Sequence, residues 1–286
     1  MEVSRLATGT LDKSKVQSLA EDIRASVIEY GYGAGKRGAH FGGSLSCVEI
    51  LACLYGGIME VEPKNLRREE RDVFLLSKGH AALAFYATLA HTGVFPTEDL
   101  QSFEQDGSQL PGHPVMNMDR GIELSSGSLG MGIGVGIGMA LGYRRRGIDK
   151  HIFVLMGDGE CDEGSVWEGA MSAAAFKLDS LVVIVDKNGI QCDGATKEVL
   201  DSADLTAKFA SFGFDVHEVA GHDIAALLDT FQEATSARNG KPKAIIADTV
   251  KGKGISFMEH QAAWHHGALS EDQYKEAMQE LGREVE

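Results

Sequence analysis

The sequence is short of proline and cysteine, and each shortage excludes a kind of protein. Only five of its 286 residues are proline, so a proline-rich disordered chain is excluded. The four cysteines, Cys47, Cys53, Cys161 and Cys192, form no CxxC pair. A chain of this length does not need disulfide bonds to stabilise its core, and we therefore expect four reduced thiols.

The chain also lacks a long hydrophobic run and an excess of positive charge. Its longest apolar run, Leu129–Gly142, spans 14 positions and is too short to cross a bilayer. Residues 1–15 contain no apolar signal core. The formal net charge of −15 repels nucleic acid and anionic membranes. We expect a cytoplasmic protein that has neither of them as a partner.

Glycine, by contrast, is abundant. The 35 glycines are roughly twice the usual share of ~7%. With so few prolines beside them, they indicate places where the backbone turns tightly or approaches a ligand closely.

Apolar and β-branched runs alternate with helical patterns along the chain. Four runs predict strands, at 73–76, 152–156, 181–185 and 244–250. Helical patterns cover 14–29, 82–90, 167–177, 223–237 and the C-terminal segment 270–286. This alternation predicts an α/β fold with a mostly parallel sheet flanked by helices. No repeat or linker interrupts it, so we expect a single domain over residues 1–286.

Two short motifs follow neighbouring apolar runs. GDGE, at 157–160, follows the run at 152–156, and DKNGI, at 186–190, follows the run at 181–185. If the two strands are adjacent, Asp158 and Asn188 meet at the sheet edge where α/β proteins bind ligands. Carboxylate, amide and carbonyl oxygens suit Mg²⁺ or Ca²⁺, and Gly157 and Gly159 allow a diphosphate to come close. Each tripeptide alone is a common turn, and the pairing carries the prediction.

This pairing resembles the thiamine diphosphate motif. The resemblance implies a three-layer thiamine-diphosphate-binding fold and a metal held by Asp158, Asn188 and the carbonyl oxygen of Ile190. It implies Mg²⁺ as the metal, with Ca²⁺ or Mn²⁺ as substitutes, and it places Gly159, Glu160 and Asn188 at the cofactor. Lys187 stands where the family has a first asparagine, which is not a ligand.

Further segments resemble transketolases over nearly the whole chain. SKGH places His80 at the cofactor diphosphate, and LPGHP places His113 in the substrate channel. HFGGSLS makes His40 the counterpart of a catalytic histidine. SSGSLG places Gly127, Ser128 and Leu129 along the cofactor, and WHH supplies a further active-site histidine, either His265 or His266. We prefer His265, for both catalysis and cofactor binding.

The sequence departs from the family at several positions. Ala39 and Phe41 flank His40, Ser128 stands where many members have proline, Met131 replaces glutamine, and Gln109 replaces arginine. These changes affect details of donor and acceptor recognition. Glu163 and Glu168 match acidic positions at a family dimer interface, but a helix N-terminus explains them equally well, and we assign them no catalytic role.

The resemblance implies transfer of a two-carbon ketol unit from a ketose, by default a phosphorylated one, to an aldose. In such a reaction His40 and His265 would stabilise or move protons at substrate oxygens, and His113 would orient sugar hydroxyls. The glutamate that activates the cofactor lies in a second family domain, beyond the part that this chain resembles. We therefore expect a partner subunit that carries it, and a heterotetramer of two such pairs.

Three alternatives stay open at this stage. One is an E1-type 2-oxo acid dehydrogenase or deoxyxylulose-phosphate-synthase-like subunit, although SKGH and PGHP argue against it. A nicotinamide dehydrogenase is disfavoured because no GxGxxG follows the first apolar strand. The third is a non-catalytic subunit that binds the cofactor. His91, His151, His217 and His222 match no family position.

Overall fold

A computed structural model describes residues 12–67 and 69–284. It is built around one sheet of five parallel strands. Across the sheet their order is β1 (Val73–Leu76), β2 (Ile152–Gly157), β3 (Leu181–Lys187), β5 (Lys243–Asp248) and β4 (Asp215–Ala220). The α/β fold with a mostly parallel sheet is therefore confirmed. Because all strands run the same way, the loops after them gather at one edge.

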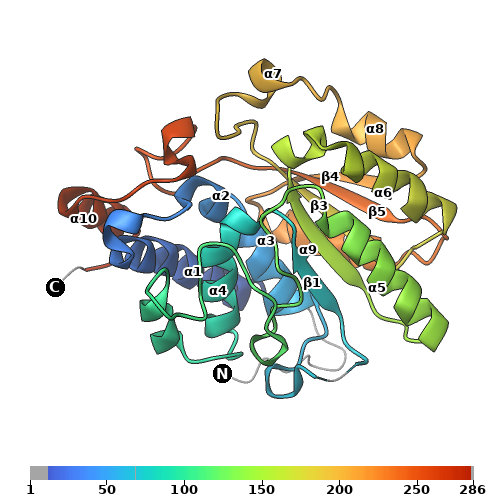
Figure 1. Cartoon of the computed structure of the whole chain (residues 1–286), viewed down its shortest axis with the longest axis horizontal. Coiled ribbons are helices and arrows are strands. Elements are labelled where there is room, and N and C mark those ends of the chain that lie inside the picture. Colours follow the sequence, from blue (N-terminus) through green and yellow to red (C-terminus); the bar gives the residue numbers. More distant parts are fainter. Residues whose placement is uncertain (1–11, 68, 285–286) are drawn as a thin grey trace.

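Helices cover both faces of the sheet (Figure 1). Alternate residues of each strand point to opposite faces. In β1, Phe74 and Leu76 join one hydrophobic cluster, whereas Val73 and Leu75 join the other. Strands buried on both sides read as continuous apolar runs, which is why the sequence revealed β1, β2, β3 and β5. The result is a three-layer arrangement.

The first layer contains α1 (Lys13–Gly33), α3 (Val48–Cys53), α4 (Ala82–His91) and α9 (Ile224–Ser236). The second contains α5 (Gly132–Arg146), α6 (Gly164–Ala175) and α8 (Leu205–Ser211). Shorter α-helices are α2 (Phe41–Leu45), α7 (Thr196–Val199) and α10 (Glu271–Glu280). A π-helical turn spans Leu54–Ile58. Short 3₁₀ turns span Gly35–Arg37, Pro63–Asn65, Gly79–Ala81, Thr97–Ser102, Met118–Arg120, Gly159–Asp162 and Ala262–His265.

The strand that the sequence did not reveal is β4, at an edge of the sheet. Only Val219 of its six residues is buried, so the segment DVHEVA lacks the apolar run that marks the other strands. The helix predicted over 167–177 instead spans Gly164–Ala175, because Lys177 adopts a positive φ of 53° that ends the helix. Element types were thus easier to predict than element boundaries.

The C-terminal segment packs beside the N-terminal helices, where Figure 1 shows red ribbon next to blue. Tyr274 of α10 stacks on Tyr32 of α1, with ring centroids 4.2 Å apart. Ser270 begins α10 with a capping box, as the predicted surface helix requires. Two parts of the sequence predictions lie outside the described residues. They are residues 1–11 of the N-terminal stretch without an apolar signal core, and residues 285–286 at the end of the predicted C-terminal helix.

Within the described ranges, no helix is long and apolar enough to cross a membrane. The cysteines there are all free. Cys47, Cys53 and Cys161 are buried and Cys192 is exposed, which confirms the expectation of unpaired thiols. Burial raises the pKa of Cys47 to about 12, so this thiol stays protonated at neutral pH.

Candidate active site at the carboxyl edge of the sheet

The loops after β2 and β3 lock together through Asp158. These strands are neighbours in the sheet, with Gly157 paired to Asp186. The Asp158 carboxylate accepts hydrogen bonds from the backbone N–H of Gly159 at 2.9 Å and of Gly189 at 2.7 Å. Asp158 and the DKNGI motif therefore meet at one edge of the sheet, as the sequence predicted.

The other two predicted metal ligands, Asn188 and Ile190, lie in the loop after β3. The Asn188 Oδ1 accepts the backbone N–H of Ile190 at 3.2 Å. The carbonyl oxygen of Ile190 accepts a hydrogen bond from the Lys251 ammonium at 2.8 Å. A metal ion bound to this carbonyl would use its second lone pair or displace Lys251.

The electrostatics of this loop favour a cation. Burial, and then the negative charge of Asp186, raise the pKa of Asp158. A divalent ion beside the carboxylate would relieve both penalties. Over residues 12–67 and 69–284 no group of three or more His, Cys, Asp or Glu side chains is placed to hold a metal. A site made of one carboxylate, one amide and one carbonyl is the kind of oxygen-rich set that Mg²⁺ accepts.

A buried ion pair, which the sequence analysis missed, lies directly beneath this loop. The Lys78 ammonium contacts the Asp186 carboxylate, and the two side chains are 1% and 0% exposed. Burial alone would raise the pKa of Asp186, but the charge of Lys78 outweighs it and holds that pKa below its usual range. Asp186 also accepts hydrogen bonds from Ser46, Thr249 and Asn188.

This pair joins the segments that carry the predicted site. Ser46 ends the HFGGSLS segment that begins with His40, Lys78 precedes His80, and Thr249 precedes Lys251. The sequence did offer a signal for this pair. Asp186 lies in the DKNGI motif and Lys78 in the SKGH motif, and each motif follows an apolar strand. What the sequence could not show is that the two face each other.

Five histidine rings gather beside this network, although they come from four separate segments. His40 is central, and its ring centroid lies 5.8 Å from His80, 5.2 Å from His113, 5.5 Å from His265 and 4.5 Å from His266. His80 and His265 lie 4.9 Å apart. The structure therefore brings together all four histidines singled out for function, and the neighbouring His266 as well.

The inner histidines stay neutral at physiological pH. Burial, followed by the charges of the neighbouring imidazoles, lowers the pKa of His40 to about 3. Burial and the Lys251 ammonium lower the pKa of His265 to about 4. A neutral imidazole offers one hydrogen-bond donor and one acceptor, which suits contacts with sugar hydroxyls and carbonyl oxygens.

Lys251 is a second residue that the sequence analysis did not single out. Its ammonium lies 3.0 Å from Nδ1 of His265, in addition to its bond with Ile190. Burial and the nearby Lys78 charge lower the pKa of Lys251 to about 8. This lysine therefore couples the histidine cluster to the loop that carries Asn188 and Ile190.

The glycine-rich loop at 125–131 lies over the ends of β1 and β2. Glu160 holds it there, because its buried carboxylate accepts the N–H of Gly130 at 2.9 Å and the hydroxyl of Ser77. Ser126 contributes a buried hydroxyl without a hydrogen-bond partner in the described chain. A Cβ on Gly79 would lie 2.7 Å from that oxygen, so glycine is needed next to His80.

The predicted cofactor residues thus fall into two groups. Gly127, Ser128 and Leu129 are exposed in the loop, where a ligand can reach them. Glu160 is different, since Ser77, Gly130 and Gly157 already occupy its carboxylate. Its side chain therefore organises the loop.

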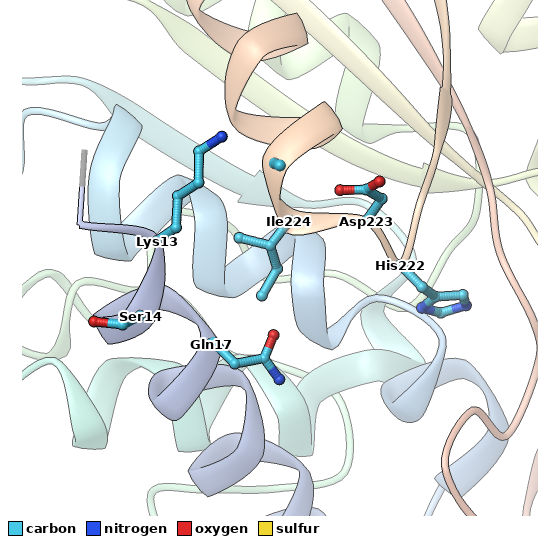
Figure 2. A pocket seen from close by; sticks show the side chains of 7 residues that line it. Lys13, Ser14, Gln17, His222, Asp223 and Ile224 are labelled. Atoms are coloured by element: carbon cyan, nitrogen blue, oxygen red, sulfur yellow. The ribbon is translucent and has the colours of Figure 1, made fainter. Parts of the chain in front are cut away.

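A surface depression of about 580 Å³ lies elsewhere, between the N-termini of α1 and α9 (Figure 2). Its lining contains none of the predicted site residues. His222 lies at its edge and is occupied structurally, since it contacts Glu49 at 2.9 Å and accepts the N–H of Val250 at 2.8 Å. His91 contacts Ser26, and His151 contacts the carbonyl of Thr235. These histidines lie apart from the cluster, consistent with their lack of a family match.

Comparisons with known proteins agree with the geometry. The profile of the family described as "Transketolase, thiamine diphosphate binding domain" matches residues 16–286. An apulose-4-phosphate transketolase subunit of Actinobacillus succinogenes is 41% identical over 271 residues, which are 95% of this chain and 97% of that protein. A 6-deoxy-6-sulfo-D-fructose transketolase subunit of a Clostridium species is 41% identical over 94% of this chain and 97% of its own length.

Solved structures give the same result for the fold. The transketolase of Leishmania mexicana superposes with a TM-score of 0.86 at 30% identity, covering 94% of this chain and 41% of that protein. A Pichia stipitis transketolase in complex with sedoheptulose 7-phosphate also gives 0.86 at 30% identity, with the same coverage of both chains. The chain therefore spans about two fifths of the solved transketolases and nearly the full length of the two bacterial relatives. On these grounds, the chain belongs to the transketolase family and is its thiamine diphosphate binding part.

Proposed function

We propose that this chain, together with a second subunit, transfers a two-carbon ketol unit from a ketose to an aldose. The observation that carries the proposal is the juxtaposition of two features at one sheet edge. The loops that carry Asp158 and Asn188 would supply metal and diphosphate ligands, and the histidines clustered around His40 would supply hydrogen bonds for a sugar.

The metal site in this proposal consists of Asp158, Asn188 and the Ile190 carbonyl. Its oxygen donors suit Mg²⁺, with Ca²⁺ or Mn²⁺ as substitutes, and phosphate oxygens and water would complete the shell. The raised pKa of Asp158 supports a cation at this place. His80, the loop residues Gly127, Ser128 and Leu129, and the backbone of Gly159 and Glu160 would hold the diphosphate.

When bound, thiamine diphosphate supplies a stabilised carbanion for breaking and forming carbon–carbon bonds next to a carbonyl. The protein's part is to bind, to orient and to move protons. His40 and His265 would donate and accept protons at the substrate carbonyl and hydroxyl oxygens. His113, which is exposed at the outer side of the cluster, would orient sugar hydroxyls.

A partner subunit follows from the kind of relative that this chain resembles. Both bacterial relatives described above are named as subunits of a transketolase, and this chain matches them over nearly their full length. We propose that the chain forms one domain over residues 1–286 and pairs with a subunit that carries the cofactor-activating glutamate. Two such pairs would form a heterotetramer.

The substrate class in this proposal is a ketose with an anionic group at its far end. The names of the relatives point to apulose 4-phosphate and 6-deoxy-6-sulfo-D-fructose as ketoses to test. D-Fructose 6-phosphate provides a comparison, because it shares its carbon skeleton with the sulfonated sugar. An aldose acceptor, D-ribose 5-phosphate, completes the assay.

The test is reconstitution. The chain is purified with the subunit that co-purifies with it, loaded with thiamine diphosphate and Mg²⁺, and assayed on the three ketoses. We expect ketol transfer from the pair and negligible transfer from the chain alone. Robust transfer by the isolated chain would contradict the two-subunit proposal, and an inert pair on all three ketoses would contradict the proposed reaction.

A further inference from the structure

His40 and His266 form a cross-strand pair. The backbones of Ala39 and Gly267 exchange two hydrogen bonds, of 2.8 and 3.0 Å, in an antiparallel bridge. In such a bridge the next residues, 40 and 266, stand opposite each other as a non-hydrogen-bonded pair, whose side chains lie on the same side and close together. The ring centroids are accordingly 4.5 Å apart, with the planes inclined at 70°.

The sequence around the bridge is suited to this close approach. Gly38 adopts a positive φ of 69°, and a Cβ there would lie 2.3 Å from the carbonyl oxygen of Gly267. Glycine is therefore required at 38 for the two segments to meet. His266 itself has extended backbone, at φ −144° and ψ 135°, as a cross-strand pair requires.

The two consecutive histidines face different surroundings. His265 is half-buried, contacts Lys251 at 3.0 Å and lies against His80. His266 is exposed, and no hydrogen bond or ion pair in the described parts of the chain engages its imidazole. His265 is thus the inner ring, and His266 is an outer ring over His40.

We propose that His266 is a further substrate-contacting residue that, with His40, binds two neighbouring hydroxyl groups of the sugar chain. This proposal rests on the proposed function. Two imidazoles at 4.5 Å have a spacing that suits vicinal hydroxyls, and each ring has two nitrogen atoms that can take part in hydrogen bonds. The ligand class is a polyhydroxylated chain. His40 and His266 together would help to discriminate among ketoses by the orientation of the hydroxyl groups of the sugar.

The first test is steady-state kinetics of the reconstituted pair on apulose 4-phosphate, 6-deoxy-6-sulfo-D-fructose and D-fructose 6-phosphate. For the substrate that the wild type uses best, we expect His266→Ala to raise KM about tenfold and to change kcat less than about threefold, the value of one lost substrate hydrogen bond. His266→Asn, which keeps a donor and an acceptor, should recover part of the loss. Thiamine diphosphate affinity should stay unchanged.

A matched control comes from a remote histidine. His217→Gln alters a half-buried ring on the edge strand β4 and should leave KM and kcat at wild-type values. A second readout needs no turnover, because diethyl pyrocarbonate modifies accessible histidines and mass spectrometry locates them. A ketose should protect His266 in the pair but should not protect the exposed His260.

The outcomes separate the two proposals. An active wild-type pair in which His266→Ala leaves KM unchanged, or in which ketose does not protect His266, would overturn the role of His266 alone. A loss of cofactor affinity in His266→Ala would also overturn it, since that result would indicate a structural or cofactor role. A wild-type pair that is inert on all three ketoses would instead refute the proposed function.

Discussion

The two halves of the candidate site are built in different ways. The part around Asp158 and Asn188 consists of the two loops that follow the adjacent strands β2 and β3. Its hydrogen bonds connect residues of the two short motifs in these loops. The histidine cluster comes from four segments that lie far apart along the chain, between His40 and His266. The first is positioned by the sheet itself, whereas the second depends on packing among α2, α4 and the C-terminal segment. Changes at Asp158 should therefore affect cofactor binding, and changes at His40 should affect turnover.

The largest expected effect is on the loop. Asp158→Ala removes the only carboxylate of the proposed metal site and the acceptor of the Gly189 N–H. We expect thiamine diphosphate affinity in the presence of Mg²⁺ to fall by about 100-fold or more, measured by calorimetry with and without the metal. Asp193→Asn, an exposed acidic residue in the same region, is the matched control. Unchanged metal-dependent affinity in Asp158→Ala would refute the metal assignment.

The next effect is on the cluster. His40→Ala should lower kcat of the reconstituted pair by about 10²–10⁴-fold, the usual contribution of a residue that transfers protons. Thiamine diphosphate affinity should change little, because His40 is not among the residues proposed to hold the diphosphate. The measurement is single-turnover kinetics beside calorimetry. Parallel losses of turnover and cofactor affinity would show that the two halves are not separable.

A smaller effect, on stability, tests the link between the halves. Lys78→Met leaves the Asp186 carboxylate buried without its counter-ion, and we expect the free energy of unfolding to fall by about 3–5 kcal/mol. Chemical denaturation measures it, and Lys275→Met, in an exposed pair with Glu271, should cost less than about 1 kcal/mol. Adding Asp186→Leu should recover part of the loss. If stability does not recover, the hydrogen bonds that Asp186 accepts from Ser46, Thr249 and Asn188 contribute more to stability than its ion pair with Lys78.

The smallest effect concerns pH. The pKa of His40 is lowered to about 3 and that of His265 to about 4, so between these values and the ordinary pKa of 6.5 the unfolded chain binds more protons. These two histidines therefore make a contribution to stability that decreases as the pH falls from about 6.5 toward about 4. Replacing His40 by Asn should make this decrease shallower in denaturation curves recorded from about pH 4 to 8. An unaltered slope would show that His40 is protonated as easily in the folded protein as in the unfolded one.

The sequence predicted more of the fold than of the site. Buried parallel strands consist of unbroken apolar runs, so β1, β2, β3 and β5 were predictable, whereas the half-exposed edge strand β4 was not. In the site, Asp158 and Asn188 could be found because each follows a strand directly. Three contacts of the site join residues between 14 and 226 positions apart. They are the ion pair of Lys78 with Asp186, the contact of Lys251 with His265, and the contact of His266 with His40. No local pattern encodes those pairings.

By itself, the sequence determined the layered α/β fold, the family and the two motifs that follow apolar strands, because apolar runs, helical patterns and short motifs are local features of the chain. Tertiary structure alone decided which histidine is inner and which is outer. It also decided that Asp186 carries a counter-ion and that the C-terminal segment returns to pair with residue 39. The physical reason is that burial and charge pairing depend on which surfaces meet, and surfaces from distant segments meet only when the whole chain has packed.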